Sequence, residues 1–255
     1  MRESFLIRIL VYASLVTALL LAPAVVAGAE ETVRFQTEDG VTVVGSLYEP
    51  AGGGRFPAVI ALHQLGSDRH SWDPLARKLT ANNYIVLAID LRGHGESTSF
   101  SGSTRAYKGF TDDDYRKMIL DVRAATAYLR GRKNVNAERF AVVGASIGAN
   151  LALQYAAEDR KVRTAVLLSP GLDYRGLKTL PYMKEYDKRA LFMIVAEDDT
   201  YSYNSCQELQ ANRELASPLK LKVYEGSAHG TTLLSAHEGL DEIIIAWLLN
   251  HLVNS

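Results

Sequence analysis

The sequence predicts a single open α/β domain, with a mostly parallel central sheet covered by helices on both faces. Its 255 residues are 47% hydrophobic and 22% charged, a composition typical of one globular domain of α/β size. Short apolar runs of strand length alternate with segments of helical spacing. Continuous apolar runs indicate strands buried on both faces, and such strands belong to parallel sheets.

The charge balance and the single cysteine exclude several classes of protein. The 28 basic and 29 acidic residues leave a net charge of -1, so nucleic acid is not an expected partner. One cysteine closes no intramolecular disulfide, and the histidines lack metal-ligand spacing, so neither a metal nor an organic cofactor is expected. Cys206 shares a helical face with Leu209 and Ala216, which favours burial over pairing between chains.

The N-terminal segment has the features of an export signal. Arg2 and Arg8 precede an apolar run over residues 9–26, and Ala27 and Ala29 supply the small side chains that a signal peptidase requires. We expect a signal peptide over residues 1–29, cleavage after Ala29, and a periplasmic or secreted domain over residues 30–255 with no membrane span. The alternative is an uncleaved N-terminal membrane anchor, because the run approaches the roughly 18 apolar residues that span a bilayer.

The domain is expected to open with a hairpin and then to alternate strands with helices. Residues 33–38 and 41–48 flank Asp39-Gly40, a strong hairpin signal. Further strands are predicted over residues 58–62, 84–89, 140–143, 162–168, 191–195 and 219–224. Helices are predicted over residues 72–82, 147–157, 202–216 and 241–252.

One long helix is predicted to begin at the N-cap Thr111. Three aspartates follow Thr111, and negative charge in the first turn is favourable beside the positive end of the helix dipole. Apolar residues then follow helical spacing as far as Leu129: Tyr115, Met118, Ile119, Val122, Ala125 and Leu129. This stripe is expected to face the sheet.

The strongest chemical signal lies between a predicted strand and a predicted helix. Strand 140–143 runs into Gly144-Ala145-Ser146-Ile147-Gly148, a G-x-S-x-G sequence in the context that a nucleophile elbow requires. The sharp turn needs glycine at positions 144 and 148 and exposes the serine at a helix N-terminus, where unpaired N–H groups favour negative charge. Ser146 is therefore the predicted nucleophile.

An acid and a base follow two later strands, where the ligand site of an open α/β sheet lies. Strand 191–195 leads to Asp199, and strand 219–224 leads to His229. The order Ser146, Asp199, His229 is that of the α/β-hydrolase catalytic triad. Asp198 and Asp173 are the alternative positions for the acid, because a loop register is not fixed to one residue by the sequence. The other histidines, including His63 and His94, are expected to be structural.

On these motifs the chain resembles the α/β-hydrolases, nearest to their serine esterase and dienelactone-hydrolase-like branch. Leu-His-Gln-Leu-Gly at 62–66 and Asp-Leu-Arg-Gly-His-Gly-Glu-Ser at 90–97 add to the resemblance, which covers essentially all of the mature sequence. It implies an oxyanion hole formed by the backbone N–H groups of Leu65 and Ile147. Gln64 departs from the usual glycine of the His-Gly pair. True dienelactone hydrolases use a cysteine nucleophile, so Ser146 disfavours that activity.

The expected function is that of a carboxylesterase that cleaves small to medium acyl esters through an acyl-enzyme. The alternatives are a serine peptidase of the same fold and a non-catalytic binding protein on the same scaffold. The segment between the strands ending at 168 and starting at 191 is too short for a large lid. Aromatic residues of this segment and of the loop after strand 84–89 are expected to shape the site: Tyr174, Tyr182, Tyr186, Phe100, Tyr107 and Phe110.

Overall fold

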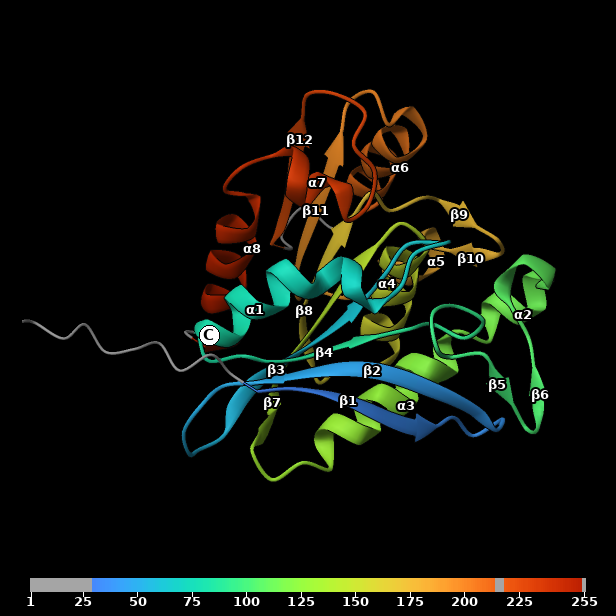
Figure 1. Cartoon of the computed structure of the whole chain (residues 1–255). Coiled ribbons are helices and arrows are strands. Elements are labelled where there is room, and N and C mark those ends of the chain that lie inside the picture. Colours follow the sequence, from blue (N-terminus) through green and yellow to red (C-terminus); the bar gives the residue numbers. More distant parts are fainter. Residues whose placement is uncertain (1–28, 214–217, 254–255) are drawn as a thin grey trace, which may run out of the picture.

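A computed structural model describes residues 29–213 and 218–253 (Figure 1). The predicted signal peptide, apart from Ala29, lies outside the described residues. No helix within the described part of the chain is long and apolar enough to cross a membrane.

A ten-stranded sheet forms the centre of the domain, in the order β12-β11-β8-β7-β3-β4-β2-β5-β6, with β1 paired to β2. Neighbours from β12 to β4 run parallel, whereas β2 is antiparallel to β1, β4 and β5. The strands are β1 (Ala29–Gln36), β2 (Val41–Glu49), β3 (Phe56–Leu62), β4 (Ile85–Ile89), β5 (Ser99–Phe100), β6 (Ser103–Thr104), β7 (Val135–Ala145), β8 (Val162–Leu168), β11 (Ala190–Ala196) and β12 (Leu219–Tyr224). The predicted mostly parallel sheet is confirmed.

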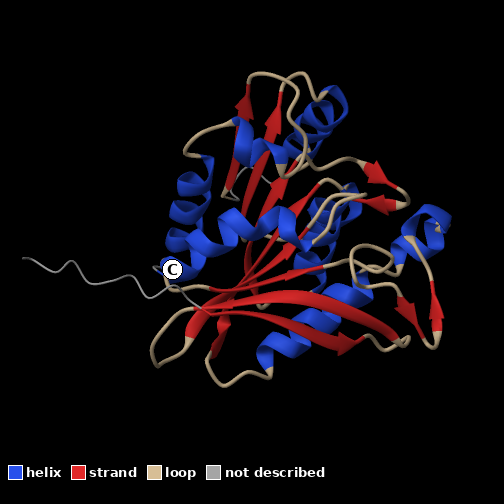
Figure 2. Cartoon of the chain, viewed as in Figure 1, coloured by secondary structure: helices blue, strands red, loops and turns tan. Residues whose placement is uncertain are grey.

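Helices cover both faces of this sheet (Figure 2). They are α1 (Asp73–Ala81), α2 (Asp112–Arg116), α3 (Ile119–Arg130), α4 (Ile147–Glu158), α5 (Leu180–Glu185), α6 (Thr200–Ala211), α7 (Thr232–Ala236) and α8 (Leu240–Leu248). One core packs α3, α4 and α6 against one face, and the other packs α1 and α8 against the opposite face. In β3, Ile60 belongs to the first core and Val59 to the second, as the alternation of side chains along a strand requires.

The opening hairpin forms where the sequence predicted it. Gly40 takes a φ of +81°, which is open to glycine without strain. The turn is closed by hydrogen bonds from the Thr37 N–H to the Val41 carbonyl (2.9 Å) and from the Gly40 N–H to the Thr37 carbonyl (3.0 Å). Cys206 is buried and free, in agreement with its predicted place on the inner face of a helix.

The long helix predicted from Thr111 is wrong in one respect, because it is divided into α2 and α3. The Thr111 capping box is present. Beyond α2, the Met118 N–H bonds to the Tyr115 carbonyl and the Asp121 N–H to the Met118 carbonyl, three residues back rather than four. Asp121 is fully buried and accepts hydrogen bonds from the backbone N–H and Nε of Arg92, both at 2.8 Å. This contact holds the first turn of α3 against the loop after β4.

Other element ends differ slightly from the prediction. Helix α6 ends at Ala211, and the side-chain amide of the C-cap residue Asn212 donates to the Glu208 carbonyl at 2.9 Å. Positions 214–216 of the predicted helix lie outside the described residues. Helix α8 continues into a π-helix over Leu249–Val253. A small hairpin, β9 (Asp173–Tyr174) and β10 (Leu177–Lys178), and the short helices α5 and α7 occupy segments in which no element was predicted.

Candidate active site

The turn between β7 and α4 holds Ser146 in a strained conformation. Its φ of +53° lies in a region that favours glycine, and such strain is concentrated at functional sites. A Cβ on Gly144 would collide with the Gly148 carbonyl, and one on Gly148 would collide with the carbonyl of Leu62 on β3. The Ser146 N–H donates to the Leu168 carbonyl at 2.8 Å, which ties the turn to the end of β8. The two glycines therefore allow the turn to pack closely against the sheet.

His229 and Asp199 meet at the same edge of the sheet, in the loops after β12 and β11. His229 Nδ1 lies 2.7 Å from Asp199 Oδ2. Burial alone would raise the pKa of Asp199, but hydrogen bonds from His229, Ser202 and Ser169 outweigh it and hold the pKa below its ordinary value. Asp199 is therefore a carboxylate at neutral pH, suited to hold one tautomer of the imidazole.

The two alternative acids lie in different environments. Asp198 is exposed, and its backbone N–H bonds to the Gly226 carbonyl at 3.0 Å. Asp173 is also exposed, and its Oδ1 accepts a hydrogen bond from the Gly176 N–H at 2.7 Å, within its own hairpin. Of the three candidate acids, Asp199 is the one hydrogen-bonded to His229.

Two buried serines and a tyrosine surround Asp199, and sequence reasoning did not identify the serines. Ser169, at the end of β8, has a φ of +51° and accepts a hydrogen bond from the Gly230 N–H at 3.0 Å. Ser202 lies 3.0 Å from the Tyr174 hydroxyl. Burial raises the pKa of Tyr174 to about 12, so its hydroxyl stays protonated. The signal for Ser169 was its place directly after a predicted strand, at the sheet edge where the other site residues lie.

The predicted oxyanion-hole donors lie on two adjoining segments. Ile147 is the first residue of α4, so its N–H lies at the helix N-terminus. Leu65 lies in the loop after β3. Within the described part of the chain, neither N–H group has a hydrogen-bond acceptor. Both residues line the cavity that also contains Ser146 and His229.

Buried His63 fixes the start of the loop that carries Leu65. Its Nε2 accepts a hydrogen bond from the Leu91 N–H at 3.0 Å, and its Nδ1 lies 2.7 Å from the Gln64 carbonyl. Burial lowers the pKa of His63 to about 4, so the ring is neutral with its proton on Nδ1. His94 lies beside it, with ring centroids 5.0 Å apart. Both histidines hold loops, as the sequence predicted.

A cavity of about 450 Å³ brings the predicted nucleophile, base and oxyanion donors together. It is lined by Gln64, Leu65, Ser146, Ile147, Asp173, Tyr174, Arg175 and His229. Asp173, Tyr174 and Arg175 belong to the β9–β10 hairpin, which therefore forms one wall of the cavity. No large lid is found among the described residues.

Of the aromatic residues expected to shape the site, Tyr174 is the one that lines this cavity. Tyr182 lines a separate cavity of about 190 Å³. Tyr186 is fully buried and donates to the Ala190 carbonyl at 2.8 Å. Tyr107 stacks on His94 with ring centroids 4.1 Å apart. Phe100 packs edge-on against Phe110. These rings anchor their own loops, which is as common a role for loop aromatics as contact with a ligand.

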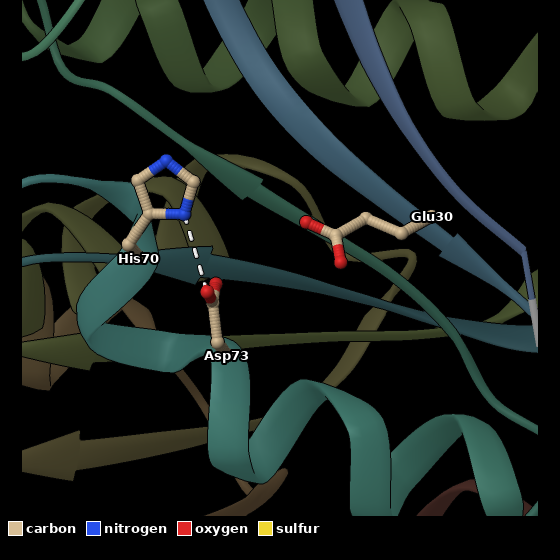
Figure 3. Close-up of side chains that lie close together, drawn as sticks. All are labelled: Glu30, His70 and Asp73. Carbon is tan, nitrogen blue, oxygen red and sulfur yellow. Dashed lines mark hydrogen bonds and ion pairs between the residues drawn. The ribbon is translucent and has the colours of Figure 1, made fainter. Parts of the chain in front are cut away.

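A second cluster of titratable side chains, Glu30, His70 and Asp73, places its possible metal-ligand atoms within 4.8 Å of one another (Figure 3). His70 Nδ1 lies 3.2 Å from Asp73 Oδ2. The Tyr48 hydroxyl donates to Asp73, and Arg77 pairs with Glu30, both at 2.6 Å. Because both carboxylates already have donors, the cluster needs no ion, and we interpret it as a surface ion-pair network.

Comparison with curated proteins finds a probable lactonase and a quorum-quenching protein among the relatives of this chain. The chain is 24% identical over 212 residues to a probable 2-oxo-3-(5-oxofuran-2-ylidene)propanoate lactonase of Bradyrhizobium sp., which covers 79% of this chain and 85% of that protein. It is 28% identical over 142 residues to the quorum-quenching protein AidA of Acinetobacter baumannii. That match spans 55% of this chain and only 44% of AidA.

Solved structures and a family comparison agree on the fold. The esterase Pf2001 of Pyrococcus furiosus superposes with a TM-score of 0.70 at 23% identity, covering 88% of this chain and 94% of that one. Acetyl xylan esterase 1 of Thermoanaerobacterium sp. gives a TM-score of 0.70 at 19% identity, covering 89% and 84%. Residues 57–233 match the family described as alpha/beta hydrolase fold. Because this match spans more than half of the chain, the protein belongs to the α/β-hydrolase family.

Proposed function

We propose that this α/β-hydrolase is a serine carboxylesterase that cleaves small to medium acyl esters through an acyl-enzyme, with Ser146, His229 and Asp199 as its catalytic triad. The observation that carries the proposal is the 2.7 Å contact between His229 and Asp199 beside the cavity that His229 and Ser146 both line. This pairing supports a base with a fixed tautomer that shares its cavity with a serine on a strained turn.

Each side chain has a defined part in the first half of the reaction. His229 Nε2 accepts the Ser146 hydroxyl proton while Oγ attacks the ester carbonyl carbon. The carbonyl oxygen takes up the electron pair, and the N–H groups of Leu65 and Ile147 donate to it, a contribution of about 3–4 kcal/mol per donor in other hydrolases. The tetrahedral intermediate collapses, the alkoxide leaves with the proton from His229, and Ser146 is left acylated.

The second half repeats these steps with water as the nucleophile. His229 takes a proton from water, the hydroxide attacks the acyl carbon, and Ser146 Oγ leaves and recovers its proton from His229. The carboxylate of Asp199 stabilises the imidazolium in both halves. Apart from the ester and water, every group in these steps is a side chain or backbone amide of this chain.

A fluorophosphonate probe tests the nucleophile directly, because only a base-activated serine beside oxyanion donors attacks such phosphorus centres rapidly. We expect mass spectrometry to locate the label on Ser146. Ser146→Ala should lose labelling and at least about a thousandfold in kcat, with folding unchanged. Ser235→Ala, on an exposed serine of α7, is the matched control and should keep both. Labelling of a different serine would contradict the assignment.

The choice of substrate distinguishes esterase activity from peptidase activity. The names of the lactonase and of the esterases above make cyclic and acyclic esters the first substrates to assay. Peptidase activity is the alternative, and it is disfavoured by chemistry, since a leaving amine must be protonated by His229 whereas a nitrophenolate leaves unaided. Dipeptide amides should therefore be far poorer substrates than p-nitrophenyl butyrate. Binding of an ester without turnover would instead support a non-catalytic protein.

Export of the domain is also a proposal. Cleavage after Ala29 would make Glu30 the first residue and would remove from β1 only the pair formed by Ala29 and Glu49. The protein expressed with its own N-terminus in a bacterial host should be recovered from the exported fraction with Glu30 first. Intact Met1 on membrane-bound protein would favour the anchor.

A further inference from the structure

Gln64 joins two loops of the site that are far apart in the sequence. Its side-chain Oε1 accepts hydrogen bonds from the Thr231 N–H at 3.0 Å and from the Thr231 hydroxyl at 2.8 Å, across 167 positions of sequence. Gly230 allows this approach, because a Cβ there would lie 2.8 Å from Gln64 Oε1. The loop that carries Leu65 is therefore fastened to the loop that carries His229.

The same contacts determine which way the carboxamide faces. A backbone N–H can only donate, so the atom that meets Thr231 N must be the oxygen and not the amide nitrogen. The two donors of Thr231 also occupy both lone pairs of that oxygen. The oxygen and nitrogen of a glutamine carboxamide have nearly the same shape, and here the hydrogen bonds decide which position each one takes.

The amide nitrogen of Gln64 is left with two donors to offer. Within residues 29–213 and 218–253, no group accepts a hydrogen bond from Nε2. Gln64 lines the cavity together with Leu65, Ser146 and His229. Gln64 is therefore a cavity-lining residue with an unpaired amide donor, and its carboxamide is held in place from the oxygen end.

We propose that Gln64 determines substrate specificity by donating an Nε2–H hydrogen bond to an oxygen that the substrate carries near its scissile ester. This inference rests on the proposed esterase function and adds a substrate class to it, namely esters with an ether, keto or similar oxygen in the acyl or alcohol chain. The oxygen of such a substrate accepts a hydrogen bond from Gln64 Nε2. A hydrocarbon chain of equal length would cover Nε2 and leave its N–H without an acceptor. A glycine at this position would have no side chain with which to make the distinction.

Two pairs of isosteric esters test the proposal. On the acyl side, p-nitrophenyl methoxyacetate is compared with p-nitrophenyl butyrate, and on the alcohol side 2-methoxyethyl acetate is compared with butyl acetate. Each pair exchanges one methylene for an oxygen. The preference is the ratio of the two kcat/KM values, divided by the ratio of the hydroxide rate constants so that intrinsic reactivity cancels.

The variants separate the donor from the loop contact. Gln64→Glu keeps an oxygen for Thr231 and loses the donor, and Gln64→Met loses both without adding charge. In both variants we expect the preference for the oxygen-bearing ester to fall about fivefold in at least one pair, as loss of one net hydrogen bond implies. The pair that responds shows on which side of the ester the donor acts. Gln207→Glu, on an exposed part of α6, makes the same chemical change elsewhere and should leave both ratios unchanged.

The outcomes distinguish this proposal from the one on which it rests. Fluorophosphonate labelling of Ser146 in the two Gln64 variants, at whatever rate, checks that the fold and the nucleophile are intact. Unchanged preferences in both pairs, with Ser146 labelled, would overturn the role of Gln64 alone. A wild-type protein that is not labelled and hydrolyses none of the four esters would overturn the esterase proposal and this inference together.

Discussion

Acidification should destabilise the fold through His63, the buried histidine that holds the loop carrying Leu65. The perturbation is a change from pH 7 to pH 4.5. His63 Nε2 accepts a hydrogen bond from the Leu91 N–H at 3.0 Å in a fully buried site. Protonation of Nε2 would remove this acceptor and leave two N–H groups facing each other. The unfolded chain has no such restriction, so it takes up the proton at an ordinary histidine pKa.

The sign and size of the effect follow from the two pKa values. Burial lowers the pKa of His63 from 6.5 in the unfolded chain to about 4 in the fold. Above pH 6.5 neither state binds the proton, and the full stability is present. As the pH falls from 6.5 toward 4, only the unfolded state binds it, so the free energy of unfolding decreases. At pH 4.5 the loss is about 2.5 kcal/mol, a large share of the typical stability of a domain.

Urea denaturation followed by circular dichroism at several pH values measures this effect. Carboxylates and His94 also titrate in this range, so the comparison is with His63→Gln, which is neutral throughout. The unfolding free energy of the wild type should fall more steeply than that of His63→Gln, by about 2.5 kcal/mol between pH 7 and pH 4.5. His70→Gln, on an exposed histidine, should follow the wild type. Parallel curves for the wild type and His63→Gln would refute the reasoning.

Three further predictions concern the site. Asp199→Asn should lower kcat on p-nitrophenyl butyrate by about 10³ to 10⁴, because it allows the wrong histidine tautomer. Asp198→Asn should lower kcat by less than about tenfold, and the reverse order of effects would make Asp198 the acid. Gly148→Ala should lower the urea-unfolding free energy by about 1–3 kcal/mol, since its Cβ meets the Leu62 carbonyl, and an unchanged midpoint would contradict this packing. The butyrate ester should be cleaved at least about tenfold faster than the palmitate ester, since a site without a large lid leaves most of a long chain in water. A preference for palmitate emulsions would indicate a lipase.

Local chemistry is enough to predict much of this protein. The order of strands and helices, the hairpin at Asp39-Gly40 and the turn around Ser146 each depend on side chains within a few residues of one another. Apolar periodicity, turn residues and the spacing of two glycines carry that information in the sequence itself. The confirmed fold class follows from the same patterns, because strands buried on both faces need helices on both sides.

Contacts between distant segments decide the rest. Arg92 binds Asp121 in the first turn of α3, and no periodicity within the helix indicates either this contact or the division between α2 and α3. The sequence places Asp173, Asp198 and Asp199 near one sheet edge, but only the fold brings one of them to His229. Gln64 meets Thr231 across 167 positions. The physical reason is common to all three: hydrogen-bond direction and distance depend on how the loops pack, which is set by the whole core and not by neighbouring residues.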